Sequence, residues 1–76
     1  MVNTNLLKAK IAEHGMNAGD FAKLLGVSRQ SISLKMNNIR EFKASEIQQA
    51  INILDIDSAD TSKYFFAKDV EKMKTM

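Results

Sequence analysis

Residues 28–34 offer hydrogen-bonding side chains to a partner and include no acidic residue. The segment reads SRQSISL, with Arg29 as its one charged side chain and with Gln30, Ser31 and Ser33 as its amide and hydroxyl groups. A helix face that meets only water more typically carries Glu and Lys. Because DNA phosphates repel carboxylates, while Gln, Ser and Arg match the donors and acceptors of the major groove, this composition favours the reading of DNA bases.

Leu34 is an apolar residue of the same segment, and its role is open. An exposed leucine here meets the methyl group of a thymine, packs on a neighbouring helix or has no function. Its direction follows from helical spacing. If Ile32 and Met36 point into the core, then Gln30, Leu34 and Asn37 point away from it.

Residues on both sides of this segment suit contacts with the phosphate backbone. Two helix N-termini offer backbone N–H groups, and the chain that follows the segment offers amide and basic side chains. These candidates are Asn17, Ala18, Ser28, Asn37, Asn38, Arg40 and Lys43. For Asn37 and Asn38, a helix C-cap and turn is a second interpretation that can hold together with the first, because Asn tolerates the left-handed conformation. We interpret Lys23 and Lys35 as solvated side chains.

Five helices are predicted to position these residues, because apolar residues recur at helical spacing along a chain without proline. The expected helices span residues 5–14, 18–25, 29–37 and 44–54, and a final short helix ends at residue 66. A three-residue turn that contains Gly26 joins the second helix to the third, as in a helix-turn-helix. The predicted fold class is therefore all-α, a compact bundle of four or five helices that contains a helix-turn-helix.

Capping residues and apolar stripes define these helices more closely. The expected N-caps are Thr4, Asn17, Ser28, and Asp57 or Ser58, and the expected helix stops are Gly15 and Gly26. The residues expected to face inward are Leu7, Ile11, Ala12, Phe21, Ala22, Leu25, Ile32, Met36, Ile47, Ala50, Ile51, Ile53 and Leu54.

Length and composition exclude several classes of protein. Seventy-six residues accommodate one domain, which we place at residues 1–66, followed at 67–76 by a tail that is a frayed helix or disordered. With no Cys and one His, the chain offers no thiolate or histidine metal site and no nucleophile–base set, so we expect no metal, cofactor or enzymatic activity. No stretch approaches the roughly 18 apolar residues of a membrane span, and we expect a cytoplasmic protein.

The charge is distributed unevenly along the chain. Residues 1–43 contain seven Lys or Arg against three Asp or Glu, whereas residues 44–76 contain four against six. The formal net charge of +2 therefore averages a basic half and an acidic half. A basic half suits a polyanion, and an acidic half suits another protein, although a solvated surface with uneven charge is the alternative.

The stretch NAGDFAKLLGVSRQSISLKMNN resembles the helix-turn-helix of the lambda-repressor-like family, which includes Cro and the phage repressors. The resemblance rests on the small Ala22, the turn residues Gly26 and Val27, and the inward Ile32. It covers roughly residues 4–66. The segments TNLLKAKIAEHG and EFKASEIQQAINILDI also resemble small Cro-like regulators of Gram-positive phages, including modulators that act together with a phage repressor.

By this resemblance, residues 29–37 form the recognition helix. The residues that would face bases or adjacent phosphates are Arg29, Gln30, Ser31, Ser33 and Leu34. Asn37 would correspond to a phosphate-binding residue. The sequence departs from the common pattern where Asn17 and Ala18 replace Gln or Thr, where Asn38 replaces a glycine, and where Lys43 replaces a small hydroxyl residue that caps the fourth helix.

Two functions from different classes are expected. The first is a Cro-type regulator that binds double-stranded operator DNA as a homodimer, since two copies reading half-sites about 34 Å apart supply affinity that one small domain lacks. The second is a module that binds a phage repressor and alters its DNA binding, through the acidic half and a candidate interface at Tyr64, Phe65 and Phe66. Core closure is the alternative role of these aromatic residues.

Overall fold

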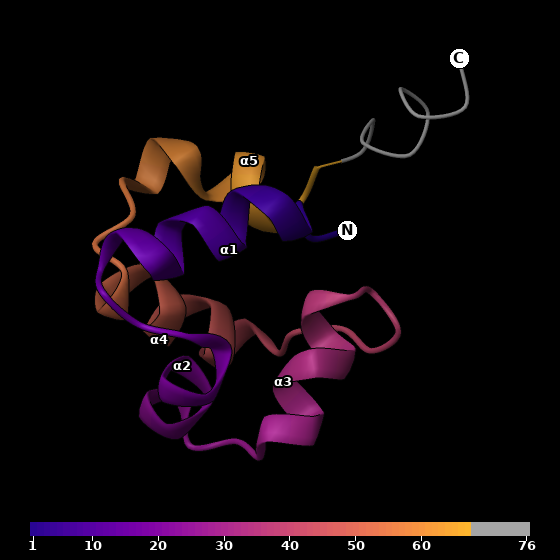
Figure 1. The fold of residues 1–76 in the computed structure, drawn as a ribbon. Helices are drawn as coiled ribbons and strands as arrows, with labels where there is room; N and C mark the ends of the chain where they lie inside the picture. Colours follow the sequence, from indigo (N-terminus) through magenta and orange to yellow (C-terminus); the bar gives the residue numbers. More distant parts are fainter. Residues whose placement is uncertain (68–76) are drawn as a thin grey trace.

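The computed structural model describes residues 1–67, and these form an all-α bundle (Figure 1). The elements are α1 (Thr4–Glu13), α2 (Ala18–Leu25), α3 (Arg29–Met36), α4 (Ala44–Ile53), the 3-10 helix η1 (Ser58–Asp60) and α5 (Thr61–Phe65). The predicted all-α fold is confirmed. Apart from Ala67, the predicted tail lies outside the described residues. In the described part of the chain, no helix is long and apolar enough to cross a membrane.

The helix beginnings follow the predicted caps with one exception. Asn17 accepts a hydrogen bond from the N–H of Asp20 at 2.8 Å, and Ser28 accepts one from the N–H of Ser31 at 3.0 Å. The predicted cap at Thr4 is wrong, because Asn3 caps α1 instead and accepts from the N–H of Leu6. The hydroxyl of Thr4 donates to the carbonyl of Met36, so it joins the first turn of α1 to the end of α3.

The first four helices all end at a residue with a left-handed backbone. These residues are Gly15, Gly26, Asn38 and Asp55, with φ of 72°, 77°, 64° and 52°. In each case the next residue donates its N–H to the carbonyl five positions back, as in the Schellman motif. Glycine, asparagine and aspartate adopt this conformation more readily than other residues, so the sequence itself sets these four helix ends.

The core lies between the helices, where α2 packs against α1, α3 and α4, and α1 packs against α5. Most of the predicted inward residues are buried, and Leu7, Phe21, Ile32 and Leu54 are completely so. Ile47, Ile51 and Ile53 are half-buried against this core. Ala12 is exposed, which corrects its inward assignment. The core also includes residues that no helical stripe predicted, namely Val2, Ile56 and Phe65.

The two ends of the described chain meet beside α1 and α5. The N–H of Asn3 donates to the carbonyl of Tyr64, and the N–H of Ala67 donates to the carbonyl of Met1, both at 2.9 Å. Figure 1 shows the N-terminus next to the end of α5. The N-terminal segment also contacts the end of α3, the recognition helix predicted from the sequence, through hydrogen bonds of Val2 and Thr4.

Candidate nucleic-acid interface

α3 has one face in the core and one face in solvent. Ile32 and Met36 are buried, whereas Gln30 and Ser33 are exposed. The other predicted base-contacting residues divide into exposed Arg29 and half-buried Ser31 and Leu34. The structure therefore gathers all five predicted base-contacting residues on one short helix and leaves the longest polar side chains accessible.

The turn before α3 holds the helix at an angle to α2. Gly26 supplies the left-handed residue, and the N–H of Val27 donates to the carbonyl of Ala22 at 3.0 Å. Ala22 is itself buried, and Val27 packs against the core. Hydrogen bonding and packing at this turn therefore hold α2 and α3 against each other.

Arg29 lies over the first turn of α2. A Cβ atom added at Gly19 would lie 3.4 Å from Nε of Arg29 and 3.2 Å from Oδ1 of Asn17. The missing side chain at Gly19 thus makes room for the arginine. This arrangement brings Arg29, predicted to contact bases, beside Asn17 and Ala18, predicted to contact phosphates.

The beginning of α2 is closed by a reciprocal pair of hydrogen bonds. Asn17 accepts from the N–H of Asp20, while a carboxylate oxygen of Asp20 accepts from the N–H of Asn17 at 3.1 Å. This capping box gives the N–H groups of Asn17 and Asp20, at the first turn of α2, their acceptors. Those of Ala18 and Gly19 have no acceptor within residues 1–67, so they are the ones that an anion can reach beside Arg29.

The side chain of Asn38 joins the end of α3 to the N-terminal segment. Its side-chain oxygen accepts from the N–H of Val2 at 2.7 Å, and its side-chain nitrogen donates to the carbonyl of Val2 at 3.0 Å. The alternative interpretation as a left-handed turn residue is confirmed. Asn37 is exposed, caps α3, and donates its side-chain N–H to the carbonyl of Ser33 at 2.8 Å.

Lys35 is buried, which corrects the interpretation that it is solvated. Its Nζ lies 2.6 Å from both carboxylate oxygens of Glu46, and the two side chains are only 6% and 11% exposed. Burial acts to raise the pKa of the Glu46 carboxyl, but hydrogen bonds from Lys35 and from the N–H of Lys43 outweigh it, so the pKa lies below its usual value. The pair therefore joins α3 to α4 as a charged cross-link.

This cross-link left a signal in the sequence. Lys35 stands three residues after Ile32 and directly before Met36, so it falls within the inward stripe of α3. Glu46 stands four residues before the buried Ala50, on the inward side of α4. One basic and one acidic residue at inward positions of two packed helices indicate a buried pair.

The remaining candidates lie at the surface or in the core. Arg40 and Lys43 are exposed and form no salt bridge within the described residues, and Ser28 is exposed at the start of α3. Phe65 is 3% exposed and packs edge-on against Phe42, with ring centroids 5.4 Å apart. Phe65 is therefore a core residue, in agreement with the alternative role of core closure.

The other two aromatic residues of that candidate interface differ from each other. Tyr64 is half-buried against the core, whereas Phe66 is 53% exposed. Within residues 1–67, no group of His, Cys, Asp or Glu is placed to hold a metal ion.

A family model described as "Protein of unknown function (DUF739)" matches residues 3–68 of the chain. Because this match covers most of the sequence, the chain belongs to that family. No curated protein matches the chain.

Proposed function

We propose that this DUF739 protein is a sequence-specific DNA-binding regulator of the phage Cro or repressor type, with α3 as the recognition helix in the major groove. The observation that carries the proposal is the exposed, acid-free polar face of α3, set on a helix whose other face is buried. Direct readout needs side chains that can approach a polyanion and still exchange hydrogen bonds with base edges. The proposed function needs no cofactor and no enzymatic activity.

Each part of the interface has a distinct role in this proposal. Gln30 and Ser33 read base edges in the major groove, and Leu34 contributes an apolar edge beside them. Arg29 and the N–H groups at the beginning of α2 hold one phosphate region, and the exposed Lys43 holds another. Phosphate contacts fix the position of the helix on the duplex, while the base contacts select the sequence.

The proposed partner is double-stranded operator DNA in the bacterial cytoplasm, bound by two copies of the chain. A recognition helix of eight residues reaches only a few base pairs. A two-fold symmetric pair of helices reads two half-sites one helical turn apart, which raises both affinity and specificity.

Selection of binding sites from random duplex DNA, followed by fluorescence anisotropy on the selected duplex, tests this proposal. Gln30→Ala is expected to weaken binding to the selected site by about 1–3 kcal/mol and to relax specificity at the base pair that it contacts. Gln49→Ala is the matched control, because Gln49 is an exposed glutamine on α4. Equal losses in both variants, or no sequence enrichment with the unmodified protein, would contradict the proposal.

Salt dependence measures the phosphate contacts separately. Removal of one contact by Lys43→Gln is expected to reduce the slope of log K against log salt by about 0.9. Lys63→Gln is the control, because Lys63 is an exposed lysine on α5, beside Asp60. An unchanged slope in Lys43→Gln would remove Lys43 from the interface without affecting the base contacts.

A second candidate function is a protein-interaction module that binds a phage repressor and changes its DNA binding. Exposed apolar side chains outside α3 favour it, since Ile39 is 73% exposed and Phe66 is 53% exposed. Purified protein that shows no sequence preference for DNA, but co-purifies with a co-expressed repressor, would support this function over the first.

A further inference from the structure

The carboxylate of Glu46 holds two separate parts of the proposed DNA interface. Its two oxygens lie 2.6 Å from Nζ of Lys35, and one of them also accepts from the N–H of Lys43 at 2.9 Å. Lys35 belongs to the recognition helix α3, whereas Lys43 stands at the start of α4 and is a proposed phosphate contact. One side chain therefore joins the helix that reads bases to a residue that holds the DNA backbone.

This junction is buried, and its polar groups are paired. Lys35 and Glu46 both lie in the interior of the described chain. Within residues 1–67, no buried side-chain nitrogen or oxygen lacks a hydrogen-bond partner. A buried polar network in which every group is paired is rigid and favours one arrangement of the elements that it connects. The pair therefore sets one distance between α3 and α4.

The Lys35–Glu46 pair adds a directional link to packing that has no preferred direction. α3 packs chiefly on α2, and α4 packs on α2 as well. Apolar contacts are non-directional, so by themselves they allow one helix to slide or tilt on another. Hydrogen bonds from one ammonium group to two carboxylate oxygens have defined lengths and angles. The pair therefore limits the tilt of α3 on α2.

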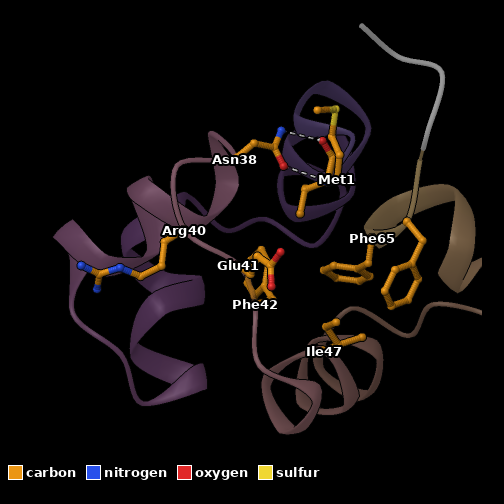
Figure 2. A pocket seen from close by; sticks show the side chains of 9 residues that line it. Met1, Asn38, Arg40, Glu41, Phe42, Ile47 and Phe65 are labelled. Carbon is orange, nitrogen blue, oxygen red and sulfur yellow. Dashed lines mark hydrogen bonds between the residues drawn. The ribbon is translucent and has the colours of Figure 1, made fainter.

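The loop between α3 and α4 is tied at both of its ends. At its start, the side chain of Asn38 forms two hydrogen bonds with the backbone of Val2, and Figure 2 shows them beside the pocket that the loop lines. At its end, the N–H of Lys43 donates to Glu46. Arg40, another candidate phosphate contact, is exposed between these two ties. The ties thus hold the basic residues after α3 in place relative to the helix.

We propose that Lys35 and Glu46 are positioning residues for DNA recognition, which fix the recognition helix relative to the phosphate contacts. This inference rests on the proposed function. Gln30 and Ser33 still select the bases, but the pair determines where these side chains stand on the duplex. Because phosphate contacts supply position and base contacts supply sequence, a fixed link between them makes both act on the same base pairs.

Stability alone does not require a buried ion pair. Because desolvation offsets the attraction between the charges, replacement of both partners by apolar residues of similar volume often leaves a protein as stable as before or more so. Such a replacement keeps the core filled but removes the directional link. It therefore separates the two roles, since stability survives while the position of α3 is no longer fixed.

Fluorescence anisotropy of folded variants, on the selected duplex and on an unrelated duplex, tests the proposal. Lys35→Met, Glu46→Leu is expected to bind the selected duplex about tenfold or more weakly, since base contacts of that strength need correct placement. Its affinity for the unrelated duplex is expected to stay within about twofold, because non-specific binding rests on phosphate contacts. Lys35→Arg keeps the ion pair and should bind both duplexes as the unmodified chain does.

A surface pair on α1 provides the matched control. Lys10→Met, Glu13→Leu removes a pair with 3.2 Å between Nζ and Oε1 by the same substitutions and likewise leaves the net charge unchanged, so neither affinity should change. Lys35→Met, Glu46→Gln is a second test variant, since the glutamine still accepts from the N–H of Lys43 while the link to α3 is lost. It should show the same loss on the selected duplex. Circular dichroism verifies that each variant is folded.

A measurement without DNA separates this inference from the proposed function. Residual dipolar couplings of the backbone N–H groups should fit one orientation for α2, α3 and α4 in the unmodified chain. In Lys35→Met, Glu46→Leu, the couplings of α3 should be smaller than that fit requires, because α3 then samples a range of tilts. Couplings of α3 that still fit, or an unchanged affinity for the selected duplex, would overturn the positioning role. Loss of the fit in a chain that selects no DNA sequence would support the fixed position of α3 and contradict the proposed function alone.

Discussion

The two ends of α3 are built in opposite ways. At the first turn, Gln30 and Arg29 are exposed, and the side chain and carbonyl of Ser28 accept hydrogen bonds from the backbone of the helix. At the last turn, the buried Lys35 pairs with Glu46 and the carbonyl of Met36 accepts from Thr4. One end of the helix is open to a partner, while the other is tied to α4 and α1.

This difference shows that the buried charged groups lie at the end of α3 that packs against α4. Lys35 and Glu46 are the only charged residues buried within residues 1–67, and together they fix a helix whose far end is proposed to read DNA. A recognition surface has to be held within a fraction of an ångström, which buried contacts behind it can provide. The anchored end should therefore determine stability, and the open end should determine specificity.

The largest effect is expected when one partner of the buried pair is removed. Lys35→Met leaves the Glu46 carboxylate buried without its cation and is expected to lower the free energy of unfolding by about 3–5 kcal/mol. Urea denaturation followed by circular dichroism measures this change. The double variant Lys35→Met, Glu46→Leu should recover most of the loss, because it removes both charges. A loss below about 1 kcal/mol in the single variant would show that the pair anchors nothing.

A smaller loss is expected at Asn38. Asn38→Gly keeps the left-handed backbone but removes two hydrogen bonds to Val2, for about 1–2 kcal/mol. Asn38→Ala also strains the left-handed residue and should cost about 1–2 kcal/mol more. The same denaturation experiment compares the two variants. Equal stability of the glycine and alanine variants would contradict the backbone contribution, and no loss in either would contradict the hydrogen bonds.

Acid should weaken the Lys35–Glu46 pair at the anchored end of α3 and so lower the free energy of unfolding. Since the pKa of Glu46 is lowered in the folded chain, its contribution to stability is present above the ordinary glutamate value of 4.5 and is lost as the pH falls through the lowered pKa. Denaturation midpoints from pH 7 down to about pH 3 measure this loss. In Glu46→Gln this part of the pH dependence should disappear. An identical pH profile in that variant would exclude Glu46 as its source.

The smallest effect on stability is expected at the open end. Gln30→Ala and Ser33→Ala remove exposed side chains and should change the free energy of unfolding by less than about 0.5 kcal/mol. Both variants should keep full helicity in circular dichroism. Unfolding of either variant would mean that this face is part of the core and that the comparison between the two ends is wrong.

Local chemistry explains which features the sequence predicted. The caps at Asn17 and Ser28 and the ends at Gly15 and Gly26 depend on side chains and backbone conformations within a few residues, so the sequence alone indicates them. Periodicity likewise found the buried stripes, because burial at i, i+3 and i+4 is a property of the helix itself. These features were sufficient to predict the all-α fold.

Contacts between distant segments explain the errors. The hydroxyl of Thr4 was assigned to its own helix but bonds to Met36, and the hydrogen bonds of Asn38 to Val2 were not predicted. Both partners are more than thirty positions away, and no local pattern encodes them. Lys35 was misjudged for a different reason, because its pairing with Glu46 becomes visible only when both helices are considered together.

Selection of binding sites from random duplex DNA, with the unmodified chain and with Gln30→Ala at one salt concentration, tests the central claim most directly. The account predicts a two-fold symmetric site for the unmodified chain and the loss of preference at the equivalent position of each half-site in the variant, with the other positions unchanged. Absence of any enriched sequence with the unmodified chain, or the same preference in both proteins, would contradict a reading role for the exposed face of α3.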